Sequence, residues 1–141
     1  AFKDSIIRQY QKRIHLFSNP DILPDFDLHV LKAVQSIAGT ATEFDDWFAA
    51  LEYMYEEAMK IDFDIAIIGC GAYGFPLAAK LKKAGKQAIH LGGATQILFG
   101  IWGARWDNVE PILRLRNEYW IRPSKDETPS GAQKVENACY W

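Results

Sequence analysis

Three glycines in the middle of the chain have the spacing of a phosphate-binding turn. Gly69, Gly71 and Gly74 follow four apolar residues at 65–68 and precede apolar residues at helical spacing. A buried strand, a G-x-G-x-x-G turn and a helix, in this order, begin a dinucleotide-binding unit. The first glycine allows a sharp turn, the second a close approach of ligand, and the third close packing of the helix. N–H groups at such a helix start attract anions, so we predict that this turn, with Ala72 inside it, binds phosphate.

A second pair of glycines follows the next predicted strand, residues 87–91. Gly92 and Gly93 end that strand, and Thr95 lies in the short helical segment after it. The carboxyl ends of neighbouring parallel strands meet at one edge of a sheet, where open α/β sheets bind their ligands. We therefore expect Gly92, Gly93 and Thr95 to lie beside the first glycine turn and to bind the same ligand.

Two further residues suggest chemistry at this edge. His90 ends the predicted strand, and its imidazole could bond a ribose or a phosphate or act as a general base, which makes it the candidate catalytic residue. A core histidine bonded to the backbone is an equal alternative. Arg105 lies in a segment rich in aromatic residues and is the candidate clamp for a diphosphate. The alternative is that this segment only packs and that Arg105 is a surface residue.

Other patterns favour no reaction of their own. Cys70 lies near a helix start, which lowers the pKa of a thiol, but a small side chain between two glycines is the simpler reason for it. The D-x-D triplets at 25–27 and 62–64 resemble the metal-binding pairs of sugar transferases. Each precedes a predicted strand, at the edge opposite to the ligand site. We expect no metal site in this chain, and the identity of any cofactor stays open.

The end of the second strand argues against NAD. NAD-binding units place an Asp or Glu about 20 residues beyond the first glycine, where it holds the ribose hydroxyls. Ile89, His90 and Leu91 occupy that window here. The turn therefore favours a nucleotide other than NAD.

The elements that must position these residues alternate along the chain. Apolar periodicity predicts helices over 4–17 and up to residue 60, with strands over 28–35, 64–68 and 87–91. Alternating helices and strands with long crossovers are typical of a parallel sheet. We predict an α/β fold, a Rossmann-like open parallel sheet with strand 64–68 at its centre and helices on both faces.

Composition limits the class of protein. The 141 residues are predicted to form a single domain over 1–141, and because the chain begins near a helix without Met, we expect it to be the C-terminal part of a longer protein. A net charge of −2 gives no reason to expect nucleic acid as a partner. No apolar run suits a membrane span, and two separated cysteines favour reduced thiols and a cytoplasmic protein. Association with further copies of the chain stays open.

The chain resembles an uncharacterised bacterial family associated with polysaccharide biosynthesis. The stretches that carry this resemblance are Ile67–Gly74, His90–Gln96, Asn117–Trp120 and Cys139–Trp141. Residues 65–103 are also distantly similar to the C-terminal half of GT-D-type glycosyltransferases, which carry a D-x-E motif in their first half. This sequence contains no D-x-E triplet.

The resemblance implies a nucleotide-sugar-binding domain of a glycosyltransferase-like protein, with a nucleoside-diphosphate sugar as the ligand. A Rossmann-like binding or scaffold domain without chemistry of its own is the alternative. An NAD-dependent oxidoreductase is a third possibility, which the missing acid disfavours. Whether the chain is an enzyme stays open.

Overall fold

The computed structural model describes residues 2–36, 41–134 and 136–141. These residues form two compact units, each described by itself below. Unit 1 comprises Leu31–Thr95, and unit 2 comprises Phe2–Val30 together with Gln96–Trp141. That the chain is one domain and the C-terminal part of a longer protein stays a prediction.

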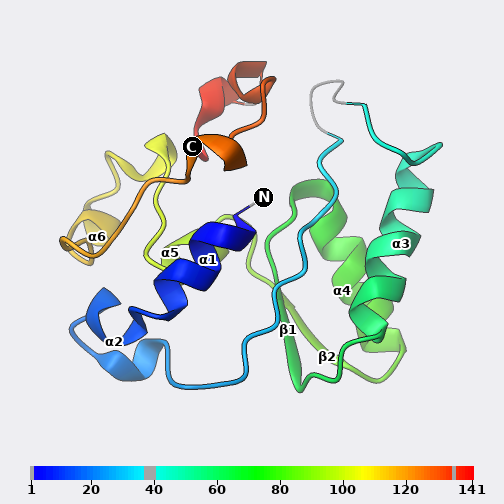
Figure 1. Ribbon diagram of the computed structural model, residues 1–141, viewed down its shortest axis with the longest axis horizontal. Coiled ribbons are helices and arrows are strands. Elements are labelled where there is room, and N and C mark those ends of the chain that lie inside the picture. The colour runs from blue at the N-terminus through cyan, green and yellow to red at the C-terminus, as the bar shows by residue number, and fades with distance from the viewer. Residues whose placement is uncertain (1, 37–40, 135) are drawn as a thin grey trace. The chain divides into compact units, whose positions relative to one another are not determined.

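Unit 1 is built on a parallel pair of strands. Strand β1 (Ile65–Ile68) pairs with β2 (Gln87–His90) in a register that runs from Ile65 opposite Gln87 to Ile68 opposite His90. Helix α4 (Gly74–Lys83) connects the two strands (Figure 1). The parallel pairing of 64–68 with 87–91 is thereby confirmed.

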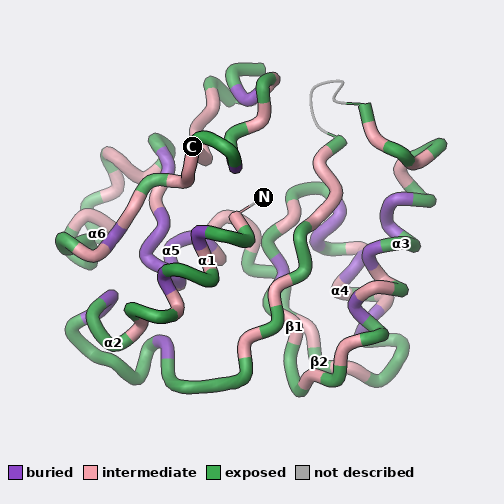
Figure 2. Tube along the Cα trace, in the orientation of Figure 1, coloured by how far each residue is buried: buried purple, intermediate pink, exposed green. Residues whose placement is uncertain are grey.

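Helices α3 and α4 cover one face of this pair. Helix α3 (Trp47–Met59) begins at Asp46, whose side chain accepts the N–H of Ala49 at 2.8 Å. Buried residues of both helices form one core with Ile68, and Ala66 and Ala88 of the strands pack against this core. On the opposite face, Ile65, Ile67 and Ile89 are 41–45% exposed and are not part of the core that the helices form. Most of both strands is coloured intermediate or exposed in Figure 2.

The prediction of a Rossmann-like open sheet is wrong. The described residues contain one sheet of two strands, with helices on one of its faces. Residues 28–35, the predicted third strand, are extended but pair with no strand. This segment crosses from unit 2 into unit 1 at Val30 and Leu31. In unit 1, the N–H of Val34 donates to the sulfur of Met54 at 3.4 Å, so it does not form part of a ladder.

Unit 2 consists of short helices and turns around its own core. The predicted helix 4–17 forms as two pieces, α1 (Lys3–Tyr10) and α2 (Arg13–Leu16), separated at Gln11 and Lys12. Helix α5 (Ala94–Leu98) crosses the boundary from unit 1, and α6 (Glu110–Leu113) follows. Isolated parallel pairing joins Ile101 to Ile121. The buried apolar core is Leu16, Phe17, Leu23, Ile97, Phe99, Ile101 and Trp120.

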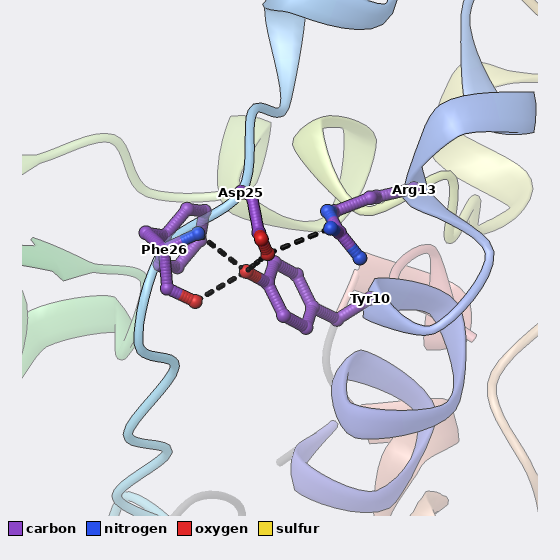
Figure 3. Close-up of polar contacts among 4 residues, drawn as sticks. All are labelled: Tyr10, Arg13, Asp25 and Phe26. Atoms are coloured by element: carbon purple, nitrogen blue, oxygen red, sulfur yellow. Dashed lines mark hydrogen bonds and ion pairs between the residues drawn. The ribbon is translucent and has the colours of Figure 1, made fainter.

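A tyrosine clamp fixes the extended segment after α2 (Figure 3). The Tyr10 hydroxyl accepts the N–H of Phe26 at 2.6 Å and contacts the Phe26 carbonyl and the Asp25 carboxylate. Arg13 forms an ion pair with Asp25 at 2.6 Å and lies over the Tyr10 ring. The first residue of the 25–27 triplet is therefore engaged in holding the chain.

Helix α1 contributes two polar anchors to the interior of unit 2. The Gln9 amide, 1% exposed, donates to the carbonyls of Gly100 at 3.2 Å and Tyr119 at 2.9 Å. The Glu127 carboxylate accepts the N–H groups of Ser5 at 3.0 Å and Ser124 at 3.2 Å, and the hydroxyls of both serines. Burial acts to raise the pKa of Glu127, but these hydrogen bonds outweigh it and hold the pKa below its usual range.

The last residues of the given chain, Cys139–Trp141, are anchored within unit 2. The N–H of Arg105 donates to the Cys139 carbonyl at 2.7 Å, and the Gln96 amide donates to the Tyr140 carbonyl at 2.9 Å. The Trp141 indole donates to the carbonyl of Glu127 at 3.0 Å. Gly103 leaves the space that this segment occupies, because a Cβ there would overlap the Cys139 and Tyr140 carbonyl groups.

Candidate functional site

The ends of β1 and β2 bring the two glycine turns of unit 1 together. The chain leaves β1 through Gly69 and Cys70, forms the short turn Gly71–Tyr73 and enters α4 at Gly74. It leaves β2 through Gly92, whose N–H donates to the Ile68 carbonyl at 3.2 Å. The predicted proximity of the two turns is therefore present.

Side chains of the second turn occupy the space between the two. A Cβ on Gly69 would lie 2.6 Å from the Thr95 hydroxyl and 2.7 Å from the Gly92 carbonyl oxygen. A Cβ on Gly74 would overlap the imidazole of His90. These two glycines therefore make room for Thr95 and His90, so the side chains of the protein itself fill the crevice that we expected a ligand to occupy. The glycine spacing alone gave no sign of this packing.

Gly71 faces open space instead. Its φ is +56°, a left-handed conformation that favours glycine, and an added Cβ would meet nothing within 4 Å. In the part of the chain that the structure describes, the N–H groups of Cys70, Gly71 and Ala72 form no hydrogen bond. Successive free N–H groups around a left-handed residue form a concave site for an anion. This open side of the turn is where the backbone can hold a phosphate.

Helix α4 adds to this anion site. Its first turn contains no acidic residue and no side chain caps it. By contrast, Asp46 caps α3, the neighbouring helix. The positive end of the α4 dipole therefore meets no acidic side chain in the first turn of the helix.

His90 is bonded to the backbone and also exposed. Its Nδ1 lies 3.2 Å from the carbonyl oxygen of Ile68, and the ring packs on Gly74. The structure thus combines the two alternatives, since the imidazole is fixed by the backbone yet remains exposed at the carboxyl edge of the sheet. A catalytic role for His90 stays a prediction.

The Thr95 hydroxyl is the unsatisfied group of this site. Its oxygen is buried and has no hydrogen-bond partner among the described residues. A buried hydroxyl without a partner costs about 1–3 kcal/mol relative to a satisfied one. Gly93 is half-buried in the same turn, between Gly92 and the start of α5 at Ala94.

Cys70 is not an activated thiol. Burial raises the pKa of Cys70 to about 11, above the ordinary value of a thiol. At neutral pH the residue is therefore a protonated thiol, and the structure favours a packing role for it.

We predict that Cys70 reacts slowly with alkylating reagents. In a Cys139→Ser variant at pH 8, a pKa of about 11 leaves so little thiolate that carboxamidomethylation should be at least ~100-fold slower than in the same protein unfolded in urea. The rate is measured by mass spectrometry over time. Rates within threefold of each other in the folded and unfolded protein would contradict the burial of this thiol.

Arg105 belongs to unit 2, where its side chain already has partners. Its guanidinium bonds to the Tyr140 hydroxyl and to Glu136 at 3.3 Å. The role of diphosphate clamp stays a prediction, and the site of unit 1 is defined without it.

The aromatic segment around Arg105 is largely packed within unit 2. Arg116 and Arg122 lie over the Trp102 ring at 4.6 and 5.0 Å, and Arg122 donates two 2.7 Å hydrogen bonds to Asp107. These bonds hold the pKa of Asp107 below its usual range. Trp120 is buried in the core, where its indole donates to the Leu16 carbonyl.

Comparisons with models of protein families, with curated proteins and with solved structures find no match to the chain. Among the described residues, no helix is long and apolar enough to cross a membrane. In the same residues, no three His, Cys, Asp or Glu side chains are grouped so that they could hold a metal ion.

Proposed function

We propose that the β1–α4–β2 segment binds the phosphate group of a nucleotide. The observation that carries the proposal is the open side of Gly71, where three successive N–H groups lack a partner among the described residues. Backbone N–H groups at the start of a helix suit phosphate oxygens in number and charge. Ala72 and Gly71 are both exposed there, so a ligand reaches them without moving the chain.

A nucleoside-diphosphate sugar is the favoured ligand. The end of β2 offers Ile89, His90 and Leu91 where NAD-binding units carry an acid, so the ribose contact that selects NAD is missing. Together with the resemblance to glycosyltransferases, this supports the nucleotide-sugar-binding part of a glycosyltransferase-like protein in bacterial polysaccharide biosynthesis.

The second candidate is a binding or scaffold unit without catalysis. It is supported by the short two-stranded sheet and by the absence of a D-x-E triplet from the sequence. A cytoplasmic location is proposed on the two free cysteines, Cys70 and Cys139, because free thiols are typical of a reducing compartment.

A pair of substitutions at Gly71 tests the proposal. Gly71→Asp places a carboxylate in the open space beside the free N–H groups, and Gly71→Asn places a neutral side chain of the same shape there. Both residues tolerate a positive φ better than most, so the backbone strain is matched. We titrate UDP, UDP-sugars, GDP-sugars and NAD(H) by calorimetry against the whole chain and both variants.

We expect a nucleotide of this panel to bind the wild-type chain and Gly71→Asn with dissociation constants within about threefold of each other. Gly71→Asp should bind it at least tenfold more weakly, because like charges a few ångströms apart repel by about 4 kcal/mol near a protein surface. Equal binding to all three proteins would reject the site. Preferential binding of NAD(H) would reject the nucleotide sugar, and no binding at all would favour the scaffold.

A further inference from the structure

The carbonyl oxygen of Ile68 determines which nitrogen of His90 carries the proton. This oxygen accepts the N–H of Leu91 at 3.0 Å, the N–H of Gly92 at 3.2 Å and a bond from His90 Nδ1 at 3.2 Å. A carbonyl oxygen only accepts hydrogen bonds, so Nδ1 must be the donor. In the neutral imidazole the proton then sits on Nδ1, and Nε2 presents a lone pair.

The position of Nε2 is also fixed. Because Gly74 has no side chain, the imidazole packs directly over it, and Nε2 lies 3.2 Å from where a Cβ of Gly74 would be. This places Nε2 at Gly74, the first residue of α4, which lies two positions beyond Ala72 of the glycine turn. His90 is exposed, and Nε2 has no hydrogen-bond partner among the described residues. The site therefore combines fixed donors on the backbone with one fixed acceptor.

We infer that His90 is a specificity-determining residue whose Nε2 accepts a hydrogen bond from a ligand hydroxyl. The inference rests on the proposed function, which assigns the phosphate to the N–H groups of residues 70–72. The lone pair of Nε2 repels phosphate oxygens and attracts an O–H donor. The N–H groups of residues 70–72 would therefore bind the phosphate of a ligand, and His90 would bind a hydroxyl group of the same ligand. Such a ligand joins a phosphate to a ribose or another sugar, and inorganic pyrophosphate lacks the second part.

Two substitutions separate the nitrogens of His90. In His90→Asn the amide nitrogen replaces Nδ1, so the bond to Ile68 is retained and the acceptor is lost. In His90→Gln the longer side chain returns an acceptor near the position of Nε2 and removes Nδ1. We titrate pyrophosphate, UDP and GDP against the whole wild-type chain and both variants at pH 8 by calorimetry.

We expect pyrophosphate to bind all three proteins within twofold. UDP or GDP should bind His90→Asn about five- to tenfold more weakly than the wild type, as for the loss of one hydrogen bond. The affinity of His90→Gln should lie between those of the other two proteins. Loss of pyrophosphate and nucleotide in parallel, or no loss of either, overturns the role of His90 and leaves the phosphate site intact. Failure of every ligand to bind the wild-type chain overturns the proposed function, and the role of His90 with it.

A spectroscopic measurement tests the inference without any variant. Long-range ¹H–¹⁵N NMR correlations of the wild-type imidazole at pH 8 distinguish a protonated Nδ1 from a protonated Nε2. We expect the Nδ1–H form in the free protein and a change of the Nε2 resonance on addition of nucleotide but not of pyrophosphate. An Nε2–H form, or identical changes with both ligands, would overturn the inference even if both variants failed to fold.

Discussion

Replacing Gln9 by glutamate should destabilise unit 2 by about 3 kcal/mol or more at pH 7, because it buries a charged acceptor against two other acceptors. In the wild type the Gln9 amide donates to the carbonyls of Gly100 and Tyr119. The glutamate has the same shape but no N–H group, and the site is only 1% exposed. Urea denaturation followed by tryptophan fluorescence measures the change in free energy of unfolding.

The neighbouring glutamine provides the control for Gln9. Gln11 lies just beyond α1 and is exposed, so Gln11→Glu adds the same charge at almost the same point of the chain. Its effect should stay within about 0.5 kcal/mol. Lowering the pH to 4 should recover part of the stability of Gln9→Glu, because a protonated carboxyl can donate to one carbonyl. Equal effects of the two substitutions would contradict the buried amide bridge.

Gly103→Ala should release the anchored end of the chain. The φ of Gly103 is −104°, so alanine suits the backbone, and the whole penalty comes from overlap of the new Cβ with the Cys139 and Tyr140 carbonyl groups. Backbone atoms yield less readily than side chains, and we expect a loss of about 2–3 kcal/mol, at the upper end for overpacking. Thermal unfolding measures the loss, and carboxypeptidase digestion followed by mass spectrometry measures release of residues 139–141.

A double-mutant cycle isolates this contact at Gly103. Deleting residues 139–141 removes the atoms that the new Cβ would meet, so Gly103→Ala should cost almost nothing in the shortened chain. The coupling between the two changes should therefore be close to the whole cost of Gly103→Ala. Additive effects would show that Gly103 is needed for another reason.

The elements that the sequence predicts well are those whose determinants are local. β1, α4 and β2 follow one another directly, and the apolar run before Gly69 and the helical spacing after Gly74 identify them. The prediction of a third strand is wrong because strand pairing depends on partners that are distant in the sequence. Residues 28–35 carry an imperfect alternation, and the chain passes there from one compact unit to the other. The alternation indicates an extended backbone, but it does not indicate whether that backbone pairs with another strand.

The candidate site also combines a local feature that the sequence predicts with distant contacts that it does not predict. The open, left-handed Gly71 is a property of a few successive residues, and the glycine spacing indicates it. The contacts of Thr95 with Gly69 and of His90 with Gly74 join residues at least 16 positions apart, and their fit depends on side-chain packing that no spacing rule contains. A short motif therefore locates the turn but does not show which of its faces is free.

The connectivity of the two units has a consequence for synthesis on the ribosome. Unit 1 is one continuous stretch, whereas unit 2 combines the first residues of the chain with the last. Helix α1 is therefore synthesised before unit 1, whereas the core residues that complete its own unit, Ile101 and Trp120 among them, are synthesised after unit 1. Strands β1 and β2 can pair, with α4 between them, before the core residues that pack against the apolar residues of α1 have been synthesised. A chain that stalls after unit 1 would leave the apolar residues of α1 without the core residues they pack against, so we expect a chaperone to bind this helix at that stage.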